Sequence, residues 1–150
     1  MLIENVIKAS DISGKAGAGP VSVSPETTLL DVTQVLAGNK MGVVLVLDTA
    51  DKVIGVLSER DIIASIAKHG EKALQMPAET VMTRDVKTCS PHDNPKDVIN
   101  TMSTGRFRHM PIIVEGRLTG LVSSSDILKY MSNHMTPDEQ FNIWVKSLWI

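Results

Sequence analysis

The sequence has little cysteine and few aromatic residues. Cys89 is the one cysteine among 150 residues, and 3% of the chain is aromatic. Because one cysteine cannot form an internal disulfide, we expect a fold without covalent cross-links, in a reducing, cytoplasmic setting. The four histidines are scattered without the spacing of metal ligands, so we also expect no metal site.

The chain also lacks a cluster of one charge and a long apolar run. Its net charge is −2 and it contains no run of lysine and arginine, which predicts that nucleic acid is not a partner. No apolar run reaches the roughly 18–20 residues that span a bilayer. The N-terminus carries Glu4 and no basic start, so we expect no secretory signal. The hydrophobic content of 43% is that of a globular domain with a core of its own.

What the sequence does contain is a repeat. Val21–Pro25 returns as Lys87–Pro91, and Gly55–Ile62 returns as Gly120–Ile127, with an offset of about 66 residues. Two copies of one structural unit therefore fill most of the chain. Paired units create a pseudo-twofold axis with a cleft on it, where recurring residues can form two related sites.

The first copy begins with a strand and a helix. Ser24-Pro25-Glu26 has the pattern of a helix start, in which Ser24 caps and Glu26 favours the positive end of the helix dipole. Gly38-Asn39 is expected to end this helix. Apolar residues at helical spacing predict its buried face, namely Leu29, Val32, Val35 and Leu36.

Two strands and a second helix complete the first copy. A continuous apolar run predicts a buried strand over 42–47, and a returning strand follows over 53–57. Ser58 and Glu59 then open a helix that His69-Gly70 closes. Its expected inner face consists of Ile62, Ile63, Ile66 and Ala67.

The second copy predicts the same order. Ser90-Pro91 leads into a helix through Val98, Ile99 and Met102. We expect a strand over 109–114, a turn over 115–117, a strand over 118–122 and a helix from about Ser124. The predicted organisation is a lead-in over 1–20, repeats over 21–70 and 86–133, a linker over 71–85 and a helical tail over 134–150.

Two segments lie outside the repeats. The glycine-rich loop over 13–20 lacks the Gly-Lys-Ser/Thr ending of a phosphate loop, so a connector is expected. In the tail, Thr136 and Pro137 predict a helix start. One face of that helix would carry Phe141, Trp144, Val145 and Leu148, packed either on its own domain or on a partner subunit.

These residues carry a family resemblance. Gly55–Asp61 and Gly120–Asp126, with Met82-Thr83 and Arg106–Pro111, make the chain resemble a tandem cystathionine-β-synthase (CBS) domain pair over about residues 5–133. The resemblance implies an α/β (α+β) fold of two βαββα repeats packed about a pseudo-twofold axis, with a C-terminal helical tail. It further implies adenine nucleotides in clefts between the repeats, and often a homodimer. Since no catalytic domain flanks the pair, we expect it to stand alone.

The repeated Ser-x-x-Asp pattern suits a nucleotide on physical grounds. The pattern falls where a strand passes into a helix, whose first amides favour anions. Asp61 and Asp126 can accept hydrogen bonds from the two hydroxyls of a ribose, and Ser58 and Ser123 can bond a ribose or phosphate oxygen. The alternative is that these serines and aspartates only cap their helices.

The charges around the two copies differ. Arg60 in the first copy stands against Ser125 in the second. Arg106, Arg108 and His109 of the second copy stand where the first has Lys40, Met41 and Gly42. We expect Arg108 and His109 to contact phosphate, and hence two clefts of unequal affinity. Arg106 has the alternative of a solvated surface charge, and His109 that of a packed, hydrogen-bonded histidine.

The remaining candidates surround the base. Met110 and Pro111 are expected to line an apolar slot for the adenine ring. By resemblance, the strand before each first helix contacts the base. The residues concerned are Ser22, Val23, Thr88 and Cys89. A nucleophilic role for Cys89 is not expected, since no histidine is placed by motif to activate it.

The sequence therefore favours a non-catalytic regulatory module. It would sense cellular energy by binding AMP foremost, or ADP, ATP or NAD(H), and would signal to a regulated protein. The chain offers no nucleophile–base pair and no carboxylate pair in distinct environments, so we expect no enzyme activity. The alternative function is an interaction module with vestigial clefts, which docks through its tryptophan-bearing tail.

Overall fold

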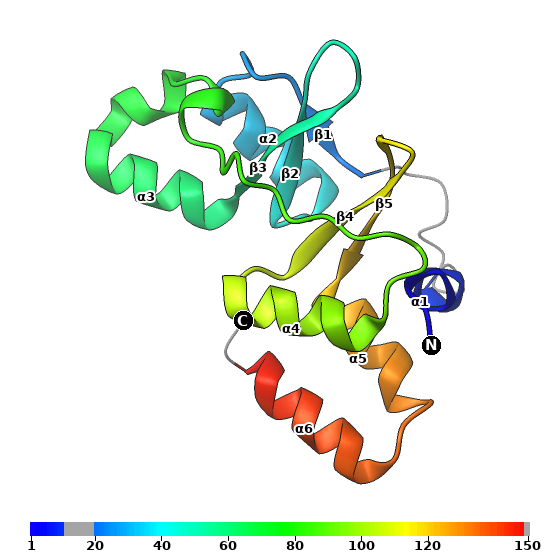
Figure 1. Cartoon of the computed structure of the whole chain (residues 1–150). Helices are drawn as coiled ribbons and strands as arrows, with labels where there is room; N and C mark the ends of the chain where they lie inside the picture. Colours follow the sequence, from blue (N-terminus) through cyan, green and yellow to red (C-terminus); the bar gives the residue numbers. More distant parts are fainter. Residues whose placement is uncertain (11–19, 149–150) are drawn as a thin grey trace. The chain divides into compact units, whose positions relative to one another are not determined.

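The computed structural model of the chain describes residues 1–10 and 20–148 (Figure 1). It divides into two compact units. The first-repeat unit spans Gly19–Val86, and the second-repeat unit combines Met1–Ala18 with Lys87–Ile150. The glycine-rich connector expected over 13–20 lies outside the described residues, apart from Pro20.

The first-repeat unit has the predicted order of elements. A three-stranded sheet with the order β1-β2-β3 places β1 parallel and β3 antiparallel to the central β2. The backbone of Thr83 exchanges hydrogen bonds of 3.0 and 2.9 Å with that of Val56, so the end of the linker lies along β3. The elements are β1 (Ser22–Val23), α2 (Leu29–Asn39), β2 (Val43–Leu47), β3 (Val53–Ser58), α3 (Glu59–His69), η2 (Gly70–Gln75) and η3 (Ala78–Thr80).

The central strand explains why this unit is stable. All four residues from Val43 to Val46 are buried, as the continuous apolar run predicts. Burial of each such side chain contributes roughly 1.5–3 kcal/mol. At Gly55 of β3 a side chain would collide with Met82, so the close approach of the linker requires glycine there. The core joins Leu29, Val32, Leu36, Val44, Val46, Leu57, Ile62, Ala78 and Met82.

The predicted start of the first helix is wrong by four residues. Helix α2 begins at Leu29, because the Thr28 hydroxyl caps it by accepting a 3.2 Å bond from the Asp31 amide. Ser24 instead begins a turn, in which its carbonyl accepts the amide of Thr27 at 3.2 Å. Proline suits the second position of such a turn as well as the first turn of a helix, so the Ser-Pro pattern did not distinguish them.

The predicted inner face of α3 is also wrong in part. Ile62 is buried, but Ile63 is 66% exposed, Ile66 is 41% exposed and Ala67 is exposed. Ser65 turns inward instead, with its hydroxyl 3.8 Å from the Met76 sulfur. The apolar pattern fits two neighbouring stripes of one helix, and packing against η2 selects the stripe through Ser65.

The second-repeat unit repeats the order around a two-stranded sheet. Strands β4 and β5 pair antiparallel, as predicted. The leading strand of this repeat is reduced to one parallel bridge between Cys89 and Ile112. The Asn94 side chain caps α4 by accepting the Lys96 amide at 2.9 Å. The elements are α4 (Pro95–Gly105), β4 (His109–Val114), β5 (Arg117–Ser123), α5 (Ser124–Ser132) and α6 (Pro137–Ser147), together with α1 (Ile3–Ser10) from the N-terminus.

Helix α1 is an integral part of the second-repeat unit, although the sequence predicts only a lead-in there. Ile3 and Val6 are fully buried in its core. The amides of Ile3 and Glu4 donate to the carbonyls of Asp93 and Pro91 at 3.0 and 2.9 Å. This core also contains Cys89, Val98, Ile99, Met102, Met110, Ile112, Val122, Ile127, Met131 and Ile143.

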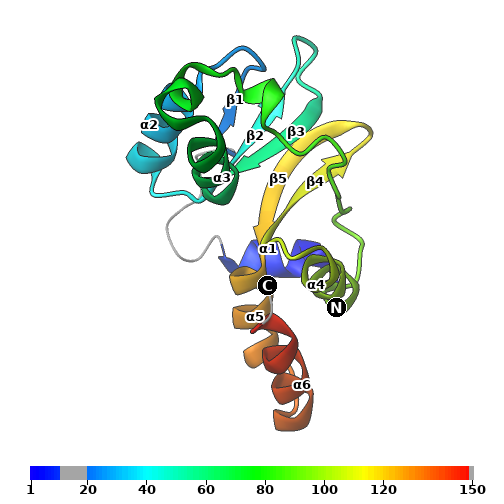
Figure 2. The same ribbon diagram turned by 90° about the vertical axis from the view of Figure 1, so that its left-hand side faces the viewer.

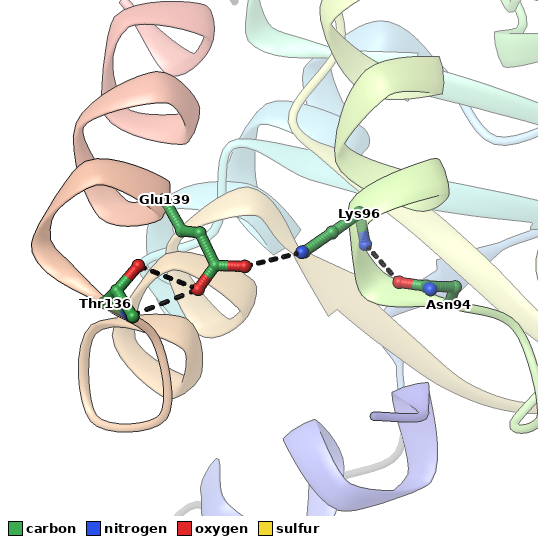
Figure 3. A network of polar contacts seen from close by, with 4 residues as sticks. All are labelled: Asn94, Lys96, Thr136 and Glu139. Carbon is green, nitrogen blue, oxygen red and sulfur yellow. Dashed lines mark hydrogen bonds and ion pairs between the residues drawn. The ribbon is translucent and has the colours of Figure 1, made fainter.

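Helix α6 packs against α4 and α5 (Figure 2). Its predicted start is confirmed, because the helix begins at Pro137. Glu139 Oε2 accepts hydrogen bonds from the amide and hydroxyl of Thr136, while its Oε1 pairs with Lys96 Nζ at 3.2 Å (Figure 3). The Thr136 amide, with Lys96, holds the pKa of Glu139 below its usual value. Ile143 is buried, whereas the face expected to pack lies exposed with Phe141, Trp144, Val145 and Leu148.

Candidate functional site

Each repeat contains a capping box where a strand passes into a helix. In the first-repeat unit, Asp61 Oδ2 accepts the amide and hydroxyl of Ser58 at 2.7 and 2.9 Å. In the second-repeat unit, Asp126 Oδ2 accepts those of Ser123 at 3.0 and 2.6 Å. The capping role that the sequence left open is therefore present in both copies.

The capping box uses only half of each carboxylate. All of its bonds to Asp61 and Asp126 reach Oδ2, and Oδ1 takes no part. Both side chains are partly exposed. A fixed, charged acceptor oxygen thus remains in each unit for a ligand hydroxyl.

Backbone geometry settles which residues of the two repeats correspond. Lys40 and Arg106 both follow their helix in the left-handed conformation, with φ of 53° and 56°. The Glu59 amide donates to the Gly42 carbonyl at 3.0 Å, just as Ser124 donates to Arg108 at 2.8 Å. Arg108 therefore corresponds to Gly42 and not to Met41, which corrects the pairing expected from the sequence. In the paired strands Val43 lies opposite Ser58, and its counterpart His109 lies opposite Ser123.

The predicted phosphate contacts lie beside the second capping box. Arg108 and Arg106 are exposed, and His109 is partly buried. Burial lowers the pKa of His109, the carboxylate of Asp126 opposes this effect, and the positive charge of Arg108 adds to it. The lowered pKa favours the neutral imidazole, and His109 lies within electrostatic reach of both charged groups. The unit brings a carboxylate acceptor, an arginine and a histidine together.

The first capping box has different neighbours. Gly42 carries no side chain, and a Cβ built there would lie 3.4 Å from Glu59 Oε1. Val43 is buried, while Arg60 and Lys40 are exposed. Glu59 is missing from the residues predicted for the site. The signal that could have found it is the glycine in the first copy where the second has Arg108.

The residues expected around the base lie partly in the cores. Ser22, Thr88 and Ser125 are exposed, and the Ser125 hydroxyl lies 2.8 Å from that of Ser123. Val23 packs against the first-repeat core. The side chains of Cys89, Met110 and Pro111 are buried, with Cys89 and Met110 in the second-repeat core.

Cys89 is buried in the second-repeat core, and its backbone is hydrogen-bonded to β4. Its amide donates to the Pro111 carbonyl and its carbonyl accepts the Ile113 amide, each at 2.9 Å. Burial, with a smaller effect of Asp93, raises the pKa of its thiol to about 12. The thiol therefore stays protonated at neutral pH, which removes its nucleophilicity.

Neither metal ligands nor a membrane span occurs in the part of the chain that the structure describes. Over residues 1–10 and 20–148, no three histidine, cysteine or carboxylate side chains gather to hold a metal ion. Among the described helices, none has the length and apolar character to cross a bilayer.

Known proteins resemble the chain over most of its length. The CBS domain profile matches residues 9–68 and 78–133. A 17.7 kDa protein of Acidianus ambivalens is 30% identical over 122 residues, which cover 81% of this chain and 73% of that protein. The match to another curated relative covers only 33% of that relative's length.

Solved structures share the fold. A CBS-domain-containing protein from Agrobacterium tumefaciens superimposes with a TM-score of 0.79 and 28% identity, covering 87% of this chain and 98% of that one. Another solved CBS domain pair has a TM-score of 0.74 and 18% identity, and covers 90% of this chain and 98% of its own. With its doubled strand–helix units and both capping boxes, the chain belongs to the CBS domain family and is a CBS domain pair.

Proposed function

We propose that this CBS domain pair is a regulatory module that binds adenine nucleotides, AMP foremost, without chemical conversion. The observation that carries the proposal is the arrangement in the second-repeat unit. There Asp126 keeps one carboxylate oxygen outside its capping box, and the backbones of Arg108 and His109 adjoin that box. A ribose needs an acceptor and a phosphate needs a cation, and this unit supplies both where the start of β4 lies beside the end of β5.

The energetics support a ribose at this carboxylate. A hydrogen bond to a charged acceptor contributes about 1.5–3 kcal/mol. The capping bonds hold the side chain of Asp126 in place, so little rotational freedom is lost when a ligand binds. The Arg108 guanidinium then adds directional contacts to a phosphate.

A related structure supports the adenosyl part of the ligand. The second solved pair described above was crystallised in complex with 5′-methylthioadenosine and S-adenosyl-L-methionine. Both are adenosyl compounds, so an adenosine group is compatible with this fold. The cations of the present chain favour an adenylate that carries phosphate, and the comparison of AMP with ADP, ATP and NAD(H) is left to the titration.

Regulation would follow from a change in arrangement. A ligand shifts a conformational equilibrium only by the difference in its affinity for the two states. We propose that nucleotide binding biases the arrangement of the two repeats, or of a homodimer, and so signals to a partner protein in the cytoplasm.

Heat denaturation with added nucleotides tests this function. A ligand that binds only the folded state at about 100 times its Kd adds roughly 2.7 kcal/mol of stability. We expect AMP to raise the melting temperature clearly, with ADP, ATP and NADH as comparisons. GMP and CMP are the matched controls, because they keep the ribose and phosphate and change only the base. No response to any adenylate would reject the proposal.

The exposed face of α6 favours a second candidate, an interaction module. Phe141 is 64% exposed and Trp144 is 56% exposed on this face, and exposed apolar patches often mark contacts with other proteins. In that case, substitution of Trp144 would abolish capture of the partner while every nucleotide left the melting temperature unchanged.

A further inference from the structure

The two repeats present opposite charges at one equivalent position. At Arg108 of the second repeat, an exposed guanidinium leaves the backbone just before β4. Its counterpart Gly42 has no side chain, and the carboxylate oxygens of Glu59 lie 3.4 and 3.6 Å from where a Cβ would be. The counterpart of Glu59 is Ser124, which is small and 8% exposed.

The other charges near this position do not cancel the difference. Lys40 and Arg106 occupy the same left-handed cap and are both positive, so they contribute equally. Arg60 follows Glu59 directly on α3. Side chains of consecutive helical residues point in different directions, so Arg60 does not neutralise the carboxylate over Gly42.

The geometry relates this charge to a ligand. In the second repeat, His109 lies opposite Ser123 of the capping box, and the Arg108 carbonyl accepts the Ser124 amide at 2.8 Å, so both residues adjoin the box of Asp126, the proposed ribose acceptor. In the first repeat the Gly42 carbonyl likewise accepts the Glu59 amide, and the adjacent Ser58 forms the capping box with Asp61. If Asp61 held a ribose in the same way as Asp126, the attached phosphate would lie near the Glu59 carboxylate. Phosphate and carboxylate are both negative, and like charges a few ångströms apart repel.

We propose that the repeats select adenosyl ligands by charge. The second repeat binds an anionic adenylate. The first repeat binds an adenosine group without a phosphate, because the Glu59 carboxylate repels a phosphate. This inference rests on the proposed function and names the ligand class of each repeat. Glu59 is the residue that determines the specificity of the first repeat, and Arg108 that of the second.

Calorimetric titration with AMP and adenosine tests this selection, because the two probes differ only in the phosphate. For the wild type we expect one strong AMP site. Glu59→Gln removes the charge with almost no change in shape, and should strengthen AMP binding at the weaker site by at least about tenfold. Arg108→Gln should weaken the strong AMP site by a similar factor. Adenosine binding should change less than about threefold in both variants.

The matched control is Glu71→Gln, an exposed carboxylate on η2 of the same unit. It should leave both titrations unchanged. If Glu59→Gln left AMP binding unchanged, or shifted AMP and adenosine equally, the charge selection would be rejected while nucleotide binding stood. Absence of heat with both ligands in all proteins would reject the proposed function and this inference with it.

Discussion

The two oxygens of Asp126 have different surroundings, because Oδ2 caps α5 and Oδ1 remains outside the capping box. Asparagine can place its carbonyl oxygen in the capping position and then turns an NH2 group toward the ligand. Asp126→Asn should therefore weaken AMP binding about 10–100-fold, the loss of one charge-assisted bond, with little change in melting temperature. Isothermal titration calorimetry measures the affinity.

Asp97→Asn is the control for this substitution, since Asp97 is also an exposed carboxylate in the first turn of a helix of the same unit. It should leave AMP affinity unchanged. Equal losses in the two variants would show that Asp126 does not contact the ribose.

Cys89 predicts a loss of stability at high pH. The folded state holds the thiol proton up to a pKa of about 12, whereas the unfolded state releases it near 9.0. The folded state thus binds more protons between these pH values. The contribution of the thiol to the free energy of unfolding is therefore fully present below pH 9 and is lost as the pH rises toward 12. Urea denaturation of the wild type and Cys89→Ala at pH 8 and pH 10.5 should show a steeper decline for the wild type. Parallel declines would contradict the shift.

At the scale of elements, the contribution of α1 to the second-repeat core can be measured by truncating one of its buried side chains. Ile3→Ala removes a fully buried side chain and should lower the free energy of unfolding by about 2–5 kcal/mol. Ile63→Ala makes the same truncation at a position that is 66% exposed, and should cost less than about 0.5 kcal/mol. Urea denaturation followed by circular dichroism measures both. Similar losses would mean that α1 does not complete the core.

The sequence predicts the elements better than their packing. Strands β2, β4 and β5 follow from apolar runs and turn residues, so their limits agree within one or two residues. The inner face of α3 could not be predicted, because it depends on contacts with η2, which follows it in the chain. Helix α1 was missed for the same reason, since its partners lie about ninety residues away and an eight-residue helix is weak by itself.

The candidate site was predictable to a similar degree. The Ser-x-x-Asp pattern gives both capping boxes, because the pattern and the hydrogen bonds are local. The position of the Glu59 carboxylate was not predictable, because it depends on the space left over Gly42. The burial of Cys89 and Met110 likewise follows from tertiary packing and not from their place in a motif.

At the scale of the whole molecule, one mass measurement reports both the bound ligand and the oligomeric state. Native mass spectrometry of the freshly purified protein should show a homodimer that carries an adenosine-containing compound. Denaturing the same sample should release that compound and return the mass of the single chain. A monomer would remove the homodimer from the proposal, and a dimer with no adenylate before or after incubation with AMP would favour the interaction module.

The position of α1 has a consequence for synthesis on the ribosome. The first-repeat unit is continuous over Gly19–Val86, so it can fold while the rest of the chain is still being made. Helix α1 precedes this unit in the chain, whereas its partners in α4, α5 and the β4–β5 hairpin follow it. The core that buries Ile3 and Val6 can therefore form only after the second repeat has been made. Helix α1 is thus made before the first-repeat unit but is buried after it.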